Sequence, residues 1–211
     1  MLASFRATKE VTSTTQEPAL SGWPKAIIPN FSEWWPGDII LVHADSSPVA
    51  KGVKAYQNKS LNPYIQKGQV WTHAAVYLGS GEIVDLTFAG GVHRAPIWEY
   101  CRNRAIRVRR HLPPWGRADG LMTAVGACSA IGQDYSLKEV ARTFLSADTA
   151  PVKGKNYCST FVGITISSNT SFNLHDKPEH RPLTPGMLAE HPYLRDVRVE
   201  WRHMASPLVV V

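Results

Sequence analysis

The chain is poor in cysteine and has no long apolar run. Its three cysteines, Cys101, Cys128 and Cys158, form no CxxC pair, which argues against a disulfide framework and against a zinc site made of cysteines alone. No apolar stretch approaches the roughly 20 residues that a membrane-spanning helix needs, so we expect no stable membrane insertion. The remaining composition, 44% hydrophobic and 19% charged over 211 residues, suffices for one domain with a sizeable core.

The N-terminal region lacks hydrophobic periodicity. Residues 1–30 are rich in Thr, Ser, Glu and Pro, which predicts a flexible or loosely packed lead-in to a single domain over 31–211. The opening residues, MLASFR, show none of the apolar core of a secretory signal. We therefore expect synthesis in the cytoplasm without a signal peptide, so that action elsewhere would need a dedicated route.

Basic residues outnumber acidic ones. The formal net charge is +6 and the pI is about 9.3, which suits an anionic partner such as cell-wall polymer, lipid headgroup or nucleic acid, or else a merely soluble basic surface. The densest basic run, residues 102–110, alternates Arg with Ala, Ile and Val and predicts a strand with one solvated face. No motif of a nucleic-acid module is present, so we do not expect nucleic acid as a partner.

Hydrophobic periodicity predicts strands first and helices afterwards, an order typical of an α+β fold with an antiparallel sheet. The expected strands cover residues 39–42, 70–78, 82–88, 105–110 and 197–202, and the expected helices cover 53–58, 117–131, 136–145 and 159–167. Turns are expected at 79–81 and 90–92. Cys101 and Cys128 stand in apolar surroundings and are interpreted as packed, structural residues.

Cys158 and His73 form the constellation most indicative of chemistry. Cys158 lies in YCSTFV at 157–162, which predicts the first turn of a buried helix. Unpaired amides and the helix dipole favour thiolate over thiol at such a position. His73 opens the strand pattern HAAVYLG and could accept the thiol proton. Either residue alone would be interpreted as structural, but their joint occurrence favours nucleophilic catalysis.

Strand alternation tests whether Asp85 could orient His73. With a three-residue loop at 79–81, Asp85 lies opposite Ala75 and shares the face of His73. With a two-residue loop it lies opposite Val76 and points away. Gly81 suits the left-handed position of a three-residue hairpin, which favours the first arrangement. If Asp85 faced away, His93 would be the alternative third polar group.

No metal or other cofactor is expected. Three histidines near the C-terminus, His175, His180 and His191, are the nearest approach to a ligand set, but their spacings match no tight metal-binding motif.

Several segments together resemble the NlpC-type, papain-like cysteine hydrolases. The matching segments are GDIILV at 37–42, HAAVYLG at 73–79, IVD at 83–85, GV at 91–92 and YCSTFV at 157–162. Because His precedes Cys here, the resemblance is to the circularly permuted, YiiX-like branch. GQDY at 132–135 and LTPGMLA at 183–189 resemble further segments of that branch, and the match spans about residues 35–190.

The resemblance implies the roles of the site residues. Cys158 would be the nucleophile, His73 the base, and Asp85 the residue that orients the imidazole, where relatives commonly carry Glu. The backbone amide of Cys158 would donate to the oxyanion, and Tyr157 would add to the pocket wall. The chemistry implied is attack on a carbonyl carbon through an acyl-enzyme on Cys158.

The family's commonest activity implies a cysteine peptidase or amidase that cleaves peptidoglycan stems. A basic enzyme suits that anionic polymer. A wall hydrolase made without a signal peptide resembles the antibacterial toxins that a dedicated system such as type VI secretion delivers. The expected partners are then peptide stems, an immunity protein and a secretion-apparatus carrier, and the site of action is the periplasm of target bacteria. Phage lysis enzymes share these features.

Two alternatives remain open at this stage. The first is a lipid-directed acyl hydrolase or acyltransferase similar to the lecithin:retinol acyltransferase group, with Trp34, Trp35 and Trp71 lining an acyl groove. No basic amphipathic helix is evident to support it. The second is a non-catalytic binding module on the same fold, which the presence of both Cys158 and His73 disfavours.

Overall fold

The computed structural model describes residues 25–43, 48–87, 90–101, 105–132, 158–177 and 183–205. Its centre is a six-stranded antiparallel sheet in the order β5-β4-β3-β2-β6-β7. The strands are β2 (Ile39–His43), β3 (His73–Gly79), β4 (Glu82–Thr87), β5 (Gly91–Pro96), β6 (Ala105–His111) and β7 (Leu194–Val197). A separate two-stranded sheet pairs β1 (Lys25–Pro29) with β8 (Trp201–Ala205).

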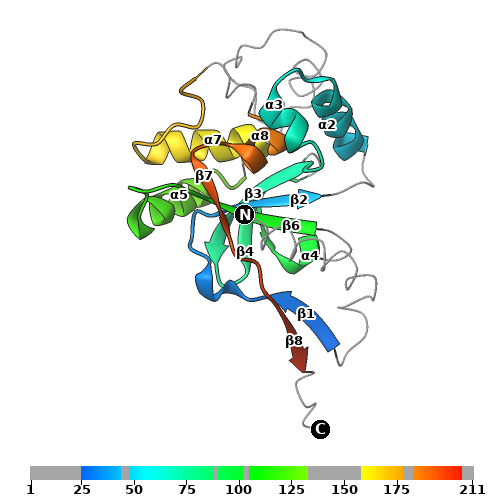
Figure 1. The fold of residues 1–211 in the computed structure, drawn as a ribbon. Coiled ribbons are helices and arrows are strands. Elements are labelled where there is room, and N and C mark those ends of the chain that lie inside the picture. Colours follow the sequence, from blue (N-terminus) through cyan, green and yellow to red (C-terminus); the bar gives the residue numbers. More distant parts are fainter. Residues whose placement is uncertain are drawn as a thin grey trace.

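Helices cover the two faces of the large sheet unequally (Figure 1). The described helices are α2 (Pro48–Lys59), α3 (Pro63–Lys67), α4 (Trp98–Cys101), α5 (Arg117–Ser129), α7 (Cys158–Asn169) and α8 (Pro185–Glu190), with a short 3-10 turn at Phe31–Glu33. Helices α3, α5, α7 and α8 pack on one face, whereas the single turn α4 lies on the other. The α+β architecture expected from the sequence is confirmed.

Strand alternation divides the apolar residues into two cores. On the face of the larger helices, Leu41, Val76 and Val84 pack against Phe161 and Ile166 of α7. On the opposite face, alternate residues of the same strands join a second core that includes Tyr100 of α4. A residue's place along a strand therefore decides which layer its side chain enters.

Several predicted boundaries were wrong. Strand β1 lies inside the segment that was expected to be a loose lead-in, and residues 1–24 lie outside the described part. The predicted strand at 197–202 is divided between β7 and β8, and β5 begins inside the predicted turn at 90–92. The predicted helix at 136–145 lies outside the described residues.

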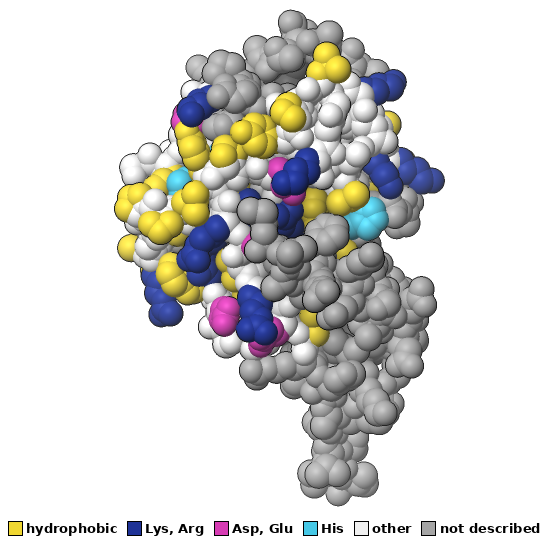
Figure 2. All heavy atoms as spheres, in the orientation of Figure 1, with side chains coloured by type: hydrophobic (Ala, Val, Ile, Leu, Met, Phe, Trp, Pro, Cys, Tyr) yellow, Lys and Arg dark blue, Asp and Glu magenta, His cyan; other side chains and the backbone are white. Residues whose placement is uncertain are grey.

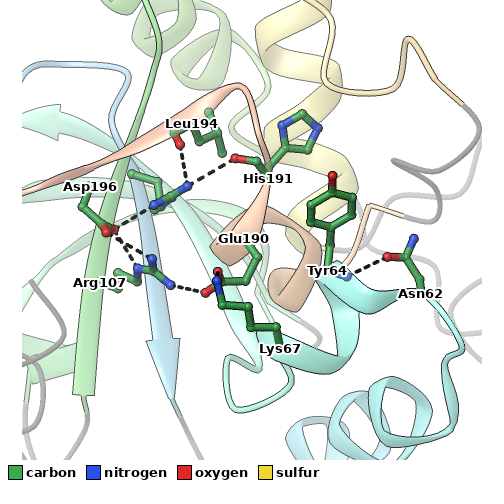
Figure 3. Close-up of polar contacts among 9 residues, drawn as sticks. Asn62, Tyr64, Lys67, Arg107, Glu190, His191, Leu194 and Asp196 are labelled. Carbon is green, nitrogen blue, oxygen red and sulfur yellow. Dashed lines mark hydrogen bonds and ion pairs between the residues drawn. The ribbon is translucent and has the colours of Figure 1, made fainter. Parts of the chain in front are cut away.

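The arginines of β6 are buried rather than solvated, which corrects the interpretation of the basic run. Arg107 bonds to Asp196 of β7 through Nε at 2.7 Å and to Glu190 of α8 at 2.7 Å. Arg109 also reaches Asp196, at 2.9 Å, and Lys67 of α3 pairs with Glu190 at 2.8 Å (Figure 3). This network ties an edge strand and two helices to the sheet. The sequence of β6 alone could not show that its arginines pair with an acidic residue of β7.

The surface view shows how the remaining charge is spread. Lys and Arg side chains stand at several separate places on the face drawn in Figure 2, between apolar and neutral patches. Among the described helices, none is both long enough and apolar enough to cross a bilayer.

Candidate active site

His73 and Asp85 meet on one face of the sheet. His73 is the first residue of β3, and Asp85 lies in the middle of the neighbouring strand β4. The His73 Nε2 atom lies 2.6 Å from Asp85 Oδ1, and the carboxylate is fully buried. Because Asp85 occupies Nε2, Nδ1 is the ring nitrogen left for another partner.

The β3–β4 hairpin has the predicted strand pairing but not the predicted loop. Its loop has two residues, Ser80 and Gly81, both with positive φ (51° and 79°), rather than the three that were predicted. A two-residue loop alone would turn Asp85 to the wrong face. The register shifts by one residue between Tyr77 and Gly79, a bulge that restores the pairing of Asp85 with Ala75.

Tyr100 is a site residue that the sequence did not reveal. Its hydroxyl donates a hydrogen bond to Asp85 Oδ2, the oxygen that His73 leaves free. Its ring also stacks on the His73 imidazole, with ring centroids 5.6 Å apart and planes within 4°. Tyr100 lies in the four-residue helix α4, and no pattern in so short an element could have indicated it.

Cys158 opens helix α7, as predicted. Its side chain is buried, and the next residue anchors the helix start, because Ser159 Oγ donates to the Leu183 carbonyl oxygen at 2.7 Å. Further along, Gly163 lets α7 approach its neighbours closely, since a Cβ there would stand 2.5 Å from Leu183 Cδ2. Both contacts are with Leu183, which therefore holds the first turns of α7, and with them Cys158, in place.

Cys158 lies close enough to His73 to affect the pKa of the imidazole. Burial lowers the pKa of His73, but the charges of Asp85 and Cys158 and hydrogen bonds to both outweigh that effect, so the pKa stands well above its ordinary value. The imidazole thus holds a proton more tightly than a free histidine does. An imidazole of this kind can take up the proton of a neighbouring thiol.

Asp85 is the buried anion that makes this possible. Burial raises the pKa of its carboxyl group, but the charge of His73 and hydrogen bonds from His73 and Tyr100 hold the pKa below its ordinary value. Asp85 therefore stays ionised beside the imidazole. His93, the alternative third residue, lies directly across from Asp85 on β5 and adds a smaller attraction. Because Asp85 itself contacts His73, His93 is not needed in that role.

Other residues singled out from the sequence lie elsewhere. Tyr157, expected in the pocket wall, is outside the described residues. Trp34 and Trp71, proposed for an acyl groove, are buried core side chains. Trp35 instead carries the Arg110 guanidinium 3.9 Å above its ring. His191 is buried and bonds to the Leu174 carbonyl oxygen at 3.1 Å.

The two remaining cysteines differ from Cys158 in their surroundings. Cys101 is buried in α4, and burial raises the pKa of its thiol to about 12. Cys128 lies on α5 as predicted, but it is exposed rather than packed. Its neighbours Ala124 and Ala127 turn to the core instead.

This contrast predicts selective alkylation by iodoacetamide. Cys158 opens a helix and lies beside His73, which can take up the proton of a thiol, whereas exposed Cys128 has no such neighbour among the described residues. We therefore expect Cys158 to react at pH 6 about tenfold faster than Cys128 or more. Cys101 is expected to stay unlabelled while the protein is folded. Peptide mass spectrometry over a time course measures all three rates in one sample. Faster labelling of Cys128 at this pH would contradict the assignment of Cys158 as the activated thiol.

The fold defined above, a six-stranded antiparallel sheet with helices, is YiiX-like. It resembles the crystal structure of the metalloprotein YiiX from Escherichia coli O157:H7 with a TM-score of 0.56 and 14% sequence identity, over 81% of this chain and 99% of that one. A likeness at this identity concerns the fold alone. No protein-family model matches the chain. No curated protein matches it either.

The name of that structure invites a test for metal ligands here. Among the described residues, no three side chains of His, Cys, Asp or Glu gather as a metal ion would require. The acidic oxygens nearest to the site are already occupied, Asp85 Oδ1 by His73 and Oδ2 by Tyr100. The described residues therefore do not fit a metal centre at this position.

Proposed function

We propose that the protein is a cysteine hydrolase of the permuted, papain-like NlpC type, with Cys158 as nucleophile, His73 as base and Asp85 as the residue that orients His73. One observation carries the proposal: His73 is bonded to the buried Asp85 carboxylate and lies close enough to Cys158, at the start of α7, for the two to interact electrostatically. Three polar groups of these types in this order are what thiol catalysis requires. Chain order does not matter, because geometry defines the constellation.

The reaction follows from the resting imidazolium–thiolate pair. The thiolate attacks the substrate carbonyl carbon, and the carbonyl electron pair moves to oxygen, where the Cys158 amide at the helix start donates to it. Collapse of this intermediate breaks the C–N bond, and the leaving amine takes the proton from His73. Water then gives a proton to His73 as it attacks the thioester, which releases the acid and restores the pair.

For the substrate we propose peptide stems of bacterial peptidoglycan. The net charge of +6 favours association with an anionic wall polymer, an attraction that salt weakens. The resemblance to wall-cleaving NlpC-type enzymes supports the same substrate. We further propose delivery into the periplasm of target bacteria as an antibacterial effector, with an immunity protein in the producing cell.

Incubation with two substrates separates this function from its alternatives. Purified sacculi and phospholipid vesicles are treated with the unaltered protein and with Cys158→Ala, and the products of both are identified by mass spectrometry. We expect soluble stem fragments that end in a new carboxyl group, formed only by the unaltered protein. Released fatty acid would favour the lipid hydrolase instead, and no product from either substrate would favour a binding module.

Expression in bacteria tests where the protein acts. We expect the protein to be tolerated in the cytoplasm, because the wall lies across the membrane, and to lyse or round the cells when a secretory signal is added. Survival and cell shape are followed by plating and microscopy. The matched control is Cys158→Ala with the same signal, which should be harmless. Toxicity confined to the cytoplasm would contradict a wall substrate.

A further inference from the structure

The carboxylate of Asp85 is held at both oxygens by two different residues. Oδ1 accepts a hydrogen bond from His73 Nε2 at 2.6 Å, and Oδ2 accepts one from the Tyr100 hydroxyl. The side chain is fully buried, so no solvent competes for either oxygen. A carboxylate bonded in this way cannot rotate about its terminal bond without losing one of the two contacts.

The same tyrosine restrains the imidazole. The Tyr100 and His73 rings lie nearly parallel in an offset stack, a favourable arrangement for two aromatic groups. Stacking limits rotation of the His73 ring, while the hydroxyl limits rotation of Asp85. Tyr100 therefore contacts both partners of the 2.6 Å hydrogen bond.

Tyr100 is itself well fixed. It is a buried member of the core on the α4 face, and its backbone amide donates to the Ile97 carbonyl oxygen at 2.9 Å. The adjacent Cys101 thiol also bonds to Ile97, at 3.3 Å. The short helix thus ties the tyrosine to the end of β5, and Ile97 is itself bonded to the β3–β4 loop, where its amide donates to the Gly81 carbonyl oxygen at 2.8 Å.

We propose that Tyr100 is a positioning residue, which holds the Asp85 carboxylate and the His73 ring in the mutual orientation that stabilises the imidazolium. The inference deepens the proposed function and rests on it for its catalytic meaning. In this role Tyr100 acts on its two neighbours, Asp85 and His73, and not on the reacting atoms. It acts through Asp85, and this route makes it testable apart from hydrolysis.

The test is the pH titration of His73, followed by NMR of its ring protons and nitrogens. Tyr100→Phe keeps the ring and removes the hydroxyl, and we expect the midpoint to fall by about one pH unit, a tenfold change in the proton equilibrium. In an Asp85→Asn background the same change should have no further effect, because the route through the carboxylate is already broken. Tyr77→Phe is the matched control: Tyr77 is a buried tyrosine in the same core, but its hydroxyl accepts from the Gly81 amide.

The outcomes are distinct. A midpoint that is unchanged or raised in Tyr100→Phe, or an equal fall in the Asp85→Asn background or in Tyr77→Phe, would overturn the proposal. Failure of the proposed function would appear separately, as a Cys158 that does not react at pH 6 in the unaltered protein. The His73 titration would still test whether Tyr100 positions His73 and Asp85. Should Tyr100→Phe not fold, the unaltered protein provides a second measurement. Its Tyr100 hydroxyl proton should exchange slowly with water, and free exchange would overturn the proposal.

Discussion

Cys158→Ala is expected to abolish hydrolysis while the protein stays folded. The substitution removes one sulfur atom from the start of α7, and the Ser159–Leu183 contact that anchors this turn is untouched. Without a nucleophile no acyl-enzyme forms, so we expect a loss of about 10⁴-fold or more. Release of soluble stem fragments from sacculi measures activity, and circular dichroism with thermal unfolding measures the fold.

The other cysteines provide the controls for this experiment. Cys128→Ser changes an exposed thiol on α5 and should leave turnover within about twofold of the unaltered protein, since surface substitutions usually have small effects. An activity in Cys158→Ala within tenfold of the unaltered protein would refute the assignment of the nucleophile. Loss of activity in Cys128→Ser with an intact fold would point to α5 instead.

His73→Ala is expected to be as damaging as Cys158→Ala. The imidazole both stabilises the thiolate and supplies the proton to the leaving amine, so its removal leaves a thiol without a base. Because the two residues act as one unit, the double variant should be no worse than either single variant. Initial rates on sacculi for the two single variants and the double variant test this directly. A further loss in the double variant would show that they act independently.

Asp85→Asn is expected to cost less than either change. An amide oxygen can still accept from His73 Nε2, but it no longer carries the charge that raises the pKa of the imidazole. The steepest loss should occur as pH rises, because a lower His73 pKa ends the imidazolium form earlier. His93→Asn is the matched control, since His93 faces Asp85 from β5 but has no part in the proposed proton transfer. An equal or larger loss in His93→Asn would reassign the third residue.

The parts of the site that were predictable are those set by local chain patterns. An apolar run after Cys158 predicted the helix, and the alternation of β3 and β4 predicted that His73 and Asp85 share a face. Both patterns depend only on neighbours in the sequence. The predicted loop length was wrong, but the predicted face of Asp85 was right, because the bulge compensates for the missing loop residue.

The parts that were not predictable depend on contacts between distant elements. Tyr100 enters the site only because α4 places it under β3 and β4, and nothing in its own four-residue helix signals this. Arg107 and Arg109 of β6 looked solvated because their acidic partners, Asp196 and Glu190, lie more than 80 positions away. Cys128 is exposed because another face of α5 packs against α7. The sequence of α5 is apolar on most sides, so it does not show which face is buried.

The bulge in the β3–β4 hairpin decides which face of the sheet Asp85 occupies. Tyr77 pairs with Ile83 only because one extra residue is accommodated before Gly79 pairs with Glu82. If Leu78 instead entered the ladder and paired with Ile83, Asp85 would lie opposite Val76, inside the apolar layer beneath the helices and away from His73. The bulge at Leu78 therefore works as a one-residue spacer that sets which layer of the molecule receives the Asp85 carboxylate, although Leu78 itself contributes no polar group to the site.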